Sequence, residues 1–294
     1  MKLVLLAFAL HIGALSVAAV AKPATSQAAV NELLAADRAF AAAAAKTDLI
    51  TGLTAMLDAE GIVPAPDAKF ARGPAEAAAL LLTNPLNAAS RVKWDPVRGG
   101  ISADWRHGFT FGYVTVTRGT GASEPGKYLA YWVKRPAGWR VLAYQRSRRP
   151  EGSVSLAMLA PSLPKKMTKR TTDAKALAGH RASLAAAEKS FSDLAQKNGL
   201  GPAFGSIGTD DAVLISLGTG FVIGAKNIER EGFGPEKTSP VYWSSNATET
   251  ASSGDLGLSW GIVRPNPGAK GQPFSYFTVW RRDTPDGPWR FIAE

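Results

Sequence analysis

The stretch SGDLGLSWG at residues 253–261 lies near the end of a chain of 294 residues, and SADWRHGFTFG at 102–112 is an imperfect copy of it. A repeated unit determines the architecture of the whole chain. If the two stretches are equivalent, the segments around them should match as well.

The repeat extends upstream, where residues 35–63 align without a gap with residues 186–214, 151 positions later. Asp37 then aligns with Glu188, so both halves keep an acid at this position. Further matched pairs are Phe40 with Phe191, Lys46 with Lys197 and Leu49 with Leu200. This match predicts the duplication of a whole folding unit.

The aromatic residues continue the register. The eight Trp residues divide four and four, although Trp105 has no counterpart in the second half. The matched aromatic pairs are Trp94 with Trp243, Phe111 with Trp260, Trp132 with Trp280 and Trp139 with Trp289. Because Trp is rare, these spacings predict two related halves.

Each half opens with helical patterns and continues with strands. Residues 28–46 carry apolar positions at helical spacing, with Asp37 placed outward. Asp48 predicts the N-cap of a short helix, and Pro74 the first turn of another. Residues 109–116 then alternate with a period of two, as strands do. Helices followed by antiparallel strands indicate an α+β fold.

The quoted stretch and the later FTVWRRDTPDGPWRF resemble the C-terminal half of a domain of the NTF2-like superfamily, in its SnoaL-like or DUF4440-like branch. The opening AAEKSF helix is similar to that family as well. The resemblance covers nearly all of 173–294 and, more weakly, 28–150. It implies a cystatin-like cone but no particular chemistry, because this fold carries isomerases, hydratases, dehydratases, carriers and inert assembly modules.

The expected fold is therefore α+β, with two tandem NTF2-like domains that each pack N-terminal helices on a curved antiparallel sheet. The chain divides into a signal peptide at 1–21, a first domain at 28–150, a linker at 151–172 and a second domain at 173–294. Such domains commonly dimerise through their sheets, so a pseudo-dimer within the chain is expected.

The first 21 residues predict export. Lys2 precedes an apolar run, and Ala19 and Ala21 form a small-x-small site, so cleavage is expected after Ala21. An uncleaved anchor is the alternative, disfavoured because the run is short for a membrane span. The chain contains no Cys, which excludes lipoprotein-type acylation. A periplasmic or secreted location is predicted.

The net charge is +10, and the densest positive stretch of the chain lies around the linker. The basic residues there include Arg146, Arg148, Arg149, Lys165 and Lys166. This pattern is typical of a solvated hinge, and the alternative is a surface that contacts anions, including a peripheral anionic membrane. Little aromatic interleaving and the predicted export argue against nucleic acid as a partner.

The sequence contains no complete motif for binding a cofactor or a metal. GASEPGK at 121–127 nearly matches a phosphate loop, but Tyr128 stands where Ser or Thr is needed. SLPK at 162–165 matches the Ser-x-x-Lys of penicillin-recognising enzymes but lies in the linker. After the leader, His107 and His180 are the only His residues, and neither lies in a ligand-spaced cluster. No cofactor and no metal are predicted.

Catalytic relatives use an acid or base directed into an apolar pocket. The candidate acid–base residues are His107, Asp104, Asp255 and Tyr242. His107 titrates near neutrality but stands at an expected strand start, where polar residues are usually exposed. Asp37 and Glu188 are interpreted as an ion pair or a helix-surface contact. No acid–base dyad is then expected at matched positions, which argues against two independent active sites.

Four aromatic residues are expected to line a ligand pocket, with core packing as the alternative. They are Trp94, Phe111, Trp243 and Trp260. The predicted function is non-catalytic binding of a small apolar ligand or a protein partner. The alternatives are an isomerase or lyase similar to ketosteroid isomerase or SnoaL cyclase, with a general base in its pocket, and an envelope scaffold with a basic contact surface.

Overall fold

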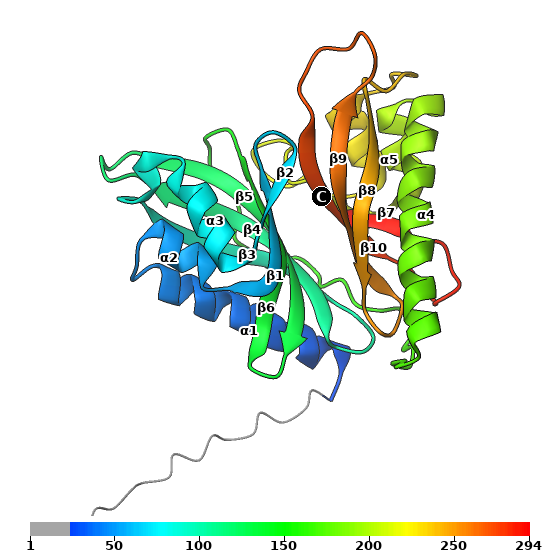
Figure 1. Cartoon of the computed structure of the whole chain (residues 1–294), viewed down its shortest axis with the longest axis horizontal. Coiled ribbons are helices and arrows are strands. Elements are labelled where there is room, and N and C mark those ends of the chain that lie inside the picture. Colours follow the sequence, from blue (N-terminus) through cyan, green and yellow to red (C-terminus); the bar gives the residue numbers. More distant parts are fainter. Residues whose placement is uncertain (1–23) are drawn as a thin grey trace, which may run out of the picture.

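The computed structural model describes residues 24–294, so the predicted signal peptide at 1–21 lies outside the described residues. Two α+β units lie side by side, with their sheets facing each other and their helices on the outer sides (Figure 1). The first unit spans residues 26–148 and the second residues 174–294. This confirms the predicted α+β class.

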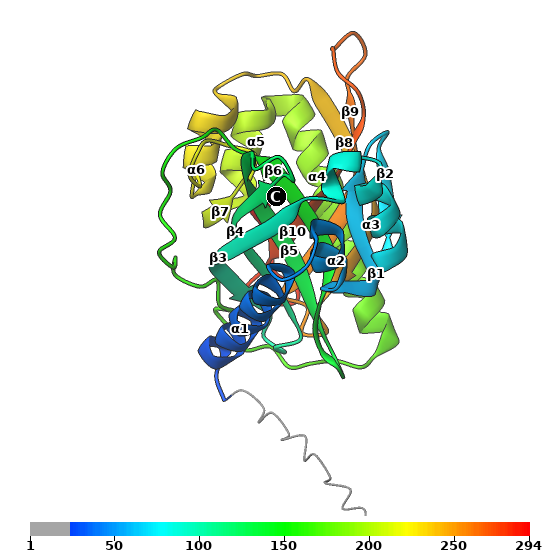
Figure 2. The same ribbon diagram turned by 90° about the vertical axis from the view of Figure 1, so that its left-hand side faces the viewer.

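In the first unit, three helices and a short helical turn cover one face of a six-stranded sheet (Figure 2). The helical elements are α1 (Ser26–Ala44), α2 (Leu49–Thr54), α3 (Gly73–Leu82) and η1 (Pro85–Asn87). The strands are β1 (Leu57–Ala65), β2 (Lys69–Arg72), β3 (Arg91–Ile101), β4 (His107–Thr117), β5 (Ser123–Arg135) and β6 (Gly138–Arg148). As predicted, Asp48 caps α2 and Pro74 lies in the first turn of α3.

The second unit repeats this plan with five strands. Its helical elements are α4 (Ala174–Asn198), α5 (Leu200–Ile207), α6 (Ala225–Ile228) and η2 (Glu229–Phe233). Its strands are β7 (Gly208–Val213), β8 (Val241–Thr250), β9 (Leu256–Pro265), β10 (Phe274–Arg281) and β11 (Arg290–Ala293). The strand order β7-β11-β10-β9-β8 matches β1-β6-β5-β4-β3 of the first unit.

Each sheet departs in one respect from the antiparallel expectation. The first strand of each unit pairs parallel with the last, through Leu57 with Val141 and Gly208 with Phe291. A parallel pair needs a long crossover, and the helix and strands between β1 and β6 provide one. The matched pairs occupy the same place in both units.

Buried apolar residues form three clusters. One lies between α1–α3 and the first sheet, and another between the second-unit helices and the second sheet. The third joins the two sheets, with Phe109 and Phe111 of β4 near Phe277 and Val279 of β10. The segment that links the units also docks, because the backbone N–H of Ser162 donates to the carbonyl of Gly99 at 3.0 Å.

Candidate functional site

The two similar stretches meet where the units pack together. The carboxylate of Asp255 accepts hydrogen bonds from the backbone N–H of Ala103, at 3.1 and 3.0 Å. In return, Asp104 accepts from the hydroxyl of Ser252 at 2.6 Å. Each aspartate therefore holds the loop of the other unit, and we call this contact the junction.

His107 and Arg281 extend the junction. The Nδ1 atom of His107 lies 3.1 Å from the hydroxyl of Tyr131, and Arg281 lies 3.5 Å from the carboxylate of Asp255. Burial lowers the pKa of His107, an effect that the charge of Asp104 partly opposes. Burial raises the pKa of Asp255, and Arg281 partly offsets this rise.

Three of the four predicted acid–base residues thus come together, away from an apolar pocket. Burial alone would raise the pKa of Asp104, but His107 and neighbouring hydroxyls lower it overall. Asp255 is 1% exposed, and its partners are groups of the junction itself. Tyr242 lies apart on β8 and is 40% exposed. This arrangement cross-links the two units.

The acid at position 37 does not point outward as expected. Asp37 is fully buried; Trp94 Nε1 donates to its Oδ1 and the Tyr128 hydroxyl to its Oδ2, each at 2.7 Å. Burial raises its pKa, and these hydrogen bonds partly offset the rise. Val30, Leu33 and Asp37 share one helical stripe, the signal that sequence reasoning missed.

The matched acid of the second unit lies in the same setting. Glu188 is fully buried and accepts from Trp243 Nε1 at 2.6 Å and Trp280 Nε1 at 3.2 Å. The hydroxyl of Ser259 also donates to it. Burial raises the pKa of Glu188 as well. The interpretation as an ion pair or helix-surface contact was wrong. Both acids are buried, and each accepts a hydrogen bond from the matched Trp of its own unit, Trp94 or Trp243.

The four aromatics expected to line one pocket lie on opposite sheet faces. Trp94 and Trp243 belong to the helix-covered clusters of their own units. Phe111 lies in the cluster between the sheets, and Trp260 packs against that cluster. The structure therefore does not bring these four side chains around one cavity.

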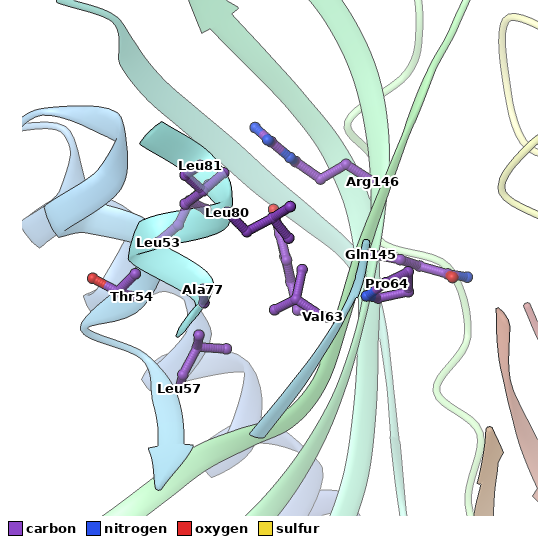
Figure 3. Close-up of a pocket in the computed structure, with 11 residues that line it drawn as sticks. Leu53, Thr54, Leu57, Val63, Pro64, Ala77, Leu80, Leu81, Gln145 and Arg146 are labelled. Carbon is purple, nitrogen blue, oxygen red and sulfur yellow. The ribbon is translucent and has the colours of Figure 1, made fainter. Parts of the chain in front are cut away.

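A pocket that sequence reasoning missed lies in the first unit, between α2, α3 and the strands β1 and β6 (Figure 3). Its volume is about 240 Å³. We call it the first-unit pocket, lined by Leu53, Thr54, Leu57, Val63, Pro64, Ala77, Leu80, Leu81, Tyr144, Gln145 and Arg146. Its walls are mostly aliphatic, as in small-molecule sites generally.

Two polar side chains of β6 line this pocket and make no hydrogen bond or ion pair through their polar atoms among residues 24–294. The Tyr144 hydroxyl is buried and makes no hydrogen bond. Burial raises the pKa of Tyr144, which keeps the phenol protonated as a donor. Arg146 makes no ion pair there, and Figure 3 shows its guanidinium reaching across the pocket end towards α3.

The second unit fills the equivalent space with aromatic rings. Leu53 of the first-unit pocket aligns with Phe204 in the gap-free repeat. The Phe204 ring lies 4.9 Å from that of Phe233 and 5.1 Å from that of Phe291, between centroids. This Leu-to-Phe difference helps to explain why the second unit, which the structure describes in full, has no pocket at the position equivalent to the first-unit pocket.

The basic residues around the linker divide between the two units. Arg148 pairs with Glu124 of the first unit at 3.3 Å, and Lys165 pairs with Asp283 of the second at 3.3 Å. Within residues 24–294, no group of three or more acids or His is placed to hold a metal ion. No helix in that range is long and apolar enough to cross a membrane.

No known family profile matches the chain, and no curated protein does. Among solved structures, an NTF2-like protein with a cystatin-like fold from Novosphingobium aromaticivorans is 18% identical, with a TM-score of 0.33, over 40% of this chain and 80% of its own. A ketosteroid isomerase-like protein from Erwinia carotovora atroseptica is 20% identical, with a TM-score of 0.30, over 44% and 97%.

An NTF-2 like protein of unknown function from Shewanella oneidensis is 13% identical, with a TM-score of 0.33, over 40% of this chain and 97% of its own. At such identities the likeness concerns the fold alone. What this chain does must therefore be inferred from its own pocket and junction.

Proposed function

We propose that this chain is a non-catalytic binding protein of two NTF2-like domains, the first of which takes up a small apolar molecule. The first-unit pocket carries this proposal. It combines aliphatic walls with the Tyr144 hydroxyl, which is buried without a partner. Leaving such a group unpaired costs about 1–3 kcal/mol, a cost that a bound acceptor removes.

The buried acids support binding over catalysis. A general base must reach the proton that it removes. Both oxygens of Asp37 are occupied by Trp94 and Tyr128, and Asp37 is fully buried. Asp104 and Asp255 are likewise bound to the opposite loop. None of these carboxylates lines the first-unit pocket.

Within residues 174–294, the second unit lacks a site of this kind at the equivalent position, and its larger and more open hollow lies elsewhere, between α4 and the segment from Trp280 to Trp289. Phe204 stands at the position that aligns with Leu53, and its larger ring packs against that of Phe233. We further propose that the protein works outside the cytoplasm, on the strength of the leader-like residues 1–21. The scaffold alternative is less favoured, because Arg148 and Lys165 are already paired with acids of different units.

A thermal-shift screen of the purified protein tests the proposal. The compounds are small apolar molecules with one ring, sterol-like molecules and vesicles of anionic lipid. A ligand at 100 times its dissociation constant stabilises by about 2.7 kcal/mol, a readable shift. We expect single-ring compounds to raise the unfolding temperature and sterols to fail, because the pocket holds only about 240 Å³.

Three results would contradict the proposal. A response to anionic vesicles alone, abolished by salt, would favour the basic contact surface. A silent screen would favour a scaffold that binds a protein partner. Turnover of a compound that binds would instead support the enzyme alternative.

A further inference from the structure

Resting on the proposed function, we infer that the first-unit pocket selects carboxylic acids: an apolar body enters between α2 and α3, and its carboxylate binds Arg146 and Tyr144. The sequence pattern nominates Arg146 only for a basic surface around the linker and does not nominate Tyr144 at all. Their position inside one pocket is a property of the folded chain.

The two groups lie on one face of one strand. Tyr144 and Arg146 are two residues apart on β6, and alternate residues of a strand share a face. Gln145, between them, points away from the pocket in Figure 3. The two donors are therefore about 7 Å apart at the backbone, and their long side chains can converge on one carboxylate.

Charge favours an anion over a neutral polar group. Arg146 is the one charged side chain among the residues that line the pocket. The nearby acid Glu124 is already held by Arg118, at 2.8 and 2.6 Å, and by Arg148 at 3.3 Å. Arg146 feels the charge of Glu124 but makes no ion pair with it, so its guanidinium hydrogen bonds are free for a ligand, and guanidinium groups bind carboxylates through paired hydrogen bonds.

The remaining wall sets the size of the apolar body. A cavity of about 150 Å³ lined by aliphatic and aromatic groups holds benzene. The first-unit pocket, at about 240 Å³, has room for one ring with a short chain. Leu53, Ala77 and Leu80 contribute apolar wall from the helices, opposite Val63 of β1.

Calorimetric titration of the purified protein with 3-phenylpropionate and its neutral amide, 3-phenylpropanamide, tests this inference. We expect the acid to bind about tenfold to a hundredfold more tightly, the usual value of a hydrogen bond to a charged group. Arg146→Gln should lower the affinity for the acid to that for the amide and leave the affinity for the amide unchanged. Tyr144→Phe should weaken the acid by about threefold to tenfold.

Arg148→Gln is the matched control, because Arg148 is exposed, pairs with Glu124 and does not line the pocket. It should leave both affinities within twofold. Equal binding of acid and amide by the unaltered protein would overturn the inference and leave the proposed function standing. Failure of both compounds to bind would contradict both the inference and the proposed function. If Arg146→Gln does not fold, the affinity of Tyr144→Phe for the acid becomes the test, and an unchanged affinity would overturn the inference.

Discussion

Asp104 and Asp255 stand at matched positions of the two units, and each binds the loop that carries the other. This reciprocity explains why the chain contains two versions of one stretch. In a symmetric dimer the same patch meets itself, and here the loops of the two units make a reciprocal contact of that kind. Each of the similar loops is therefore part of the other's binding surface.

The junction should be a main source of stability. Asp255→Ala removes the acceptor for the Ala103 N–H and leaves the buried guanidinium of Arg281 without its ion pair. Breaking a buried pair typically costs about 3–5 kcal/mol, and we expect a loss in that range from urea unfolding. Asp283→Ala, which removes an exposed acid paired with Lys165, should cost less than about 0.5 kcal/mol. Similar losses in both variants would contradict the account.

The buried acid Asp37 should make folding depend on pH in an unusual direction. Its pKa is raised in the folded state above 3.8, so the folded protein keeps this proton longer than the unfolded chain. The associated stability is full below about pH 3.8 and is lost as the pH rises through the folded pKa. Asp37→Asn should abolish that loss.

The measurement is the difference in unfolding free energy between the unaltered protein and Asp37→Asn across pH. It should change by about 1.4 kcal/mol per pH unit within the window above pH 3.8. Asp193→Asn, at an exposed position of α4, is the control and should show no such slope. A flat difference for Asp37→Asn would show that the acid keeps an ordinary pKa.

His107 should act in the opposite sense. Burial lowers its pKa below 6.5, so the unfolded chain takes up this proton first as the pH falls. Stability is then full above about pH 6.5 and is lost below it. His107→Gln should reduce the loss between pH 6.5 and 5, measured by chemical unfolding. An unchanged profile would mean that the imidazole protonates freely in the folded state.

Much of the fold could be predicted from sequence, because it rests on local signals. Asp48 and Pro74 mark helix starts through their own backbone chemistry, and the alternation of β4 places Phe111 and Val114 on opposite faces. The parallel pairing of β1 with β6 could not be predicted in this way. It joins strands that are distant in sequence, and no local pattern specifies such a partner.

The candidate site was harder to predict for the same reason. Asp37 was placed outward because acids usually face water, although its spacing from Val30 and Leu33 put it on the buried stripe. The first-unit pocket depends on what Leu53 leaves unfilled, and unfilled space has no sequence signature. The structural comparison of Leu53 with Phe204 shows why the space is open in the first unit.

Leu53 and Phe204 should each lose their effect on pocket space when each is replaced by the other's residue type. Leu53→Phe should fill the first-unit pocket and abolish the thermal shift caused by single-ring ligands, while the ligand-free protein keeps its fold. Phe204→Leu should open space beside Phe233 and cost about 1–2 kcal/mol, read from urea unfolding. Ligand binding that survives Leu53→Phe unchanged would place the site elsewhere.

The central claim is that a small ligand occupies the first-unit pocket, and intermolecular NOEs test it most directly. The protein is labelled at its Leu and Val methyl groups and saturated with 3-phenylpropionate. The account predicts NOEs from the ligand ring to methyl groups of Leu53, Leu80 and Val63. Ring NOEs confined to methyl groups of the second unit, or none at any methyl group, would contradict it.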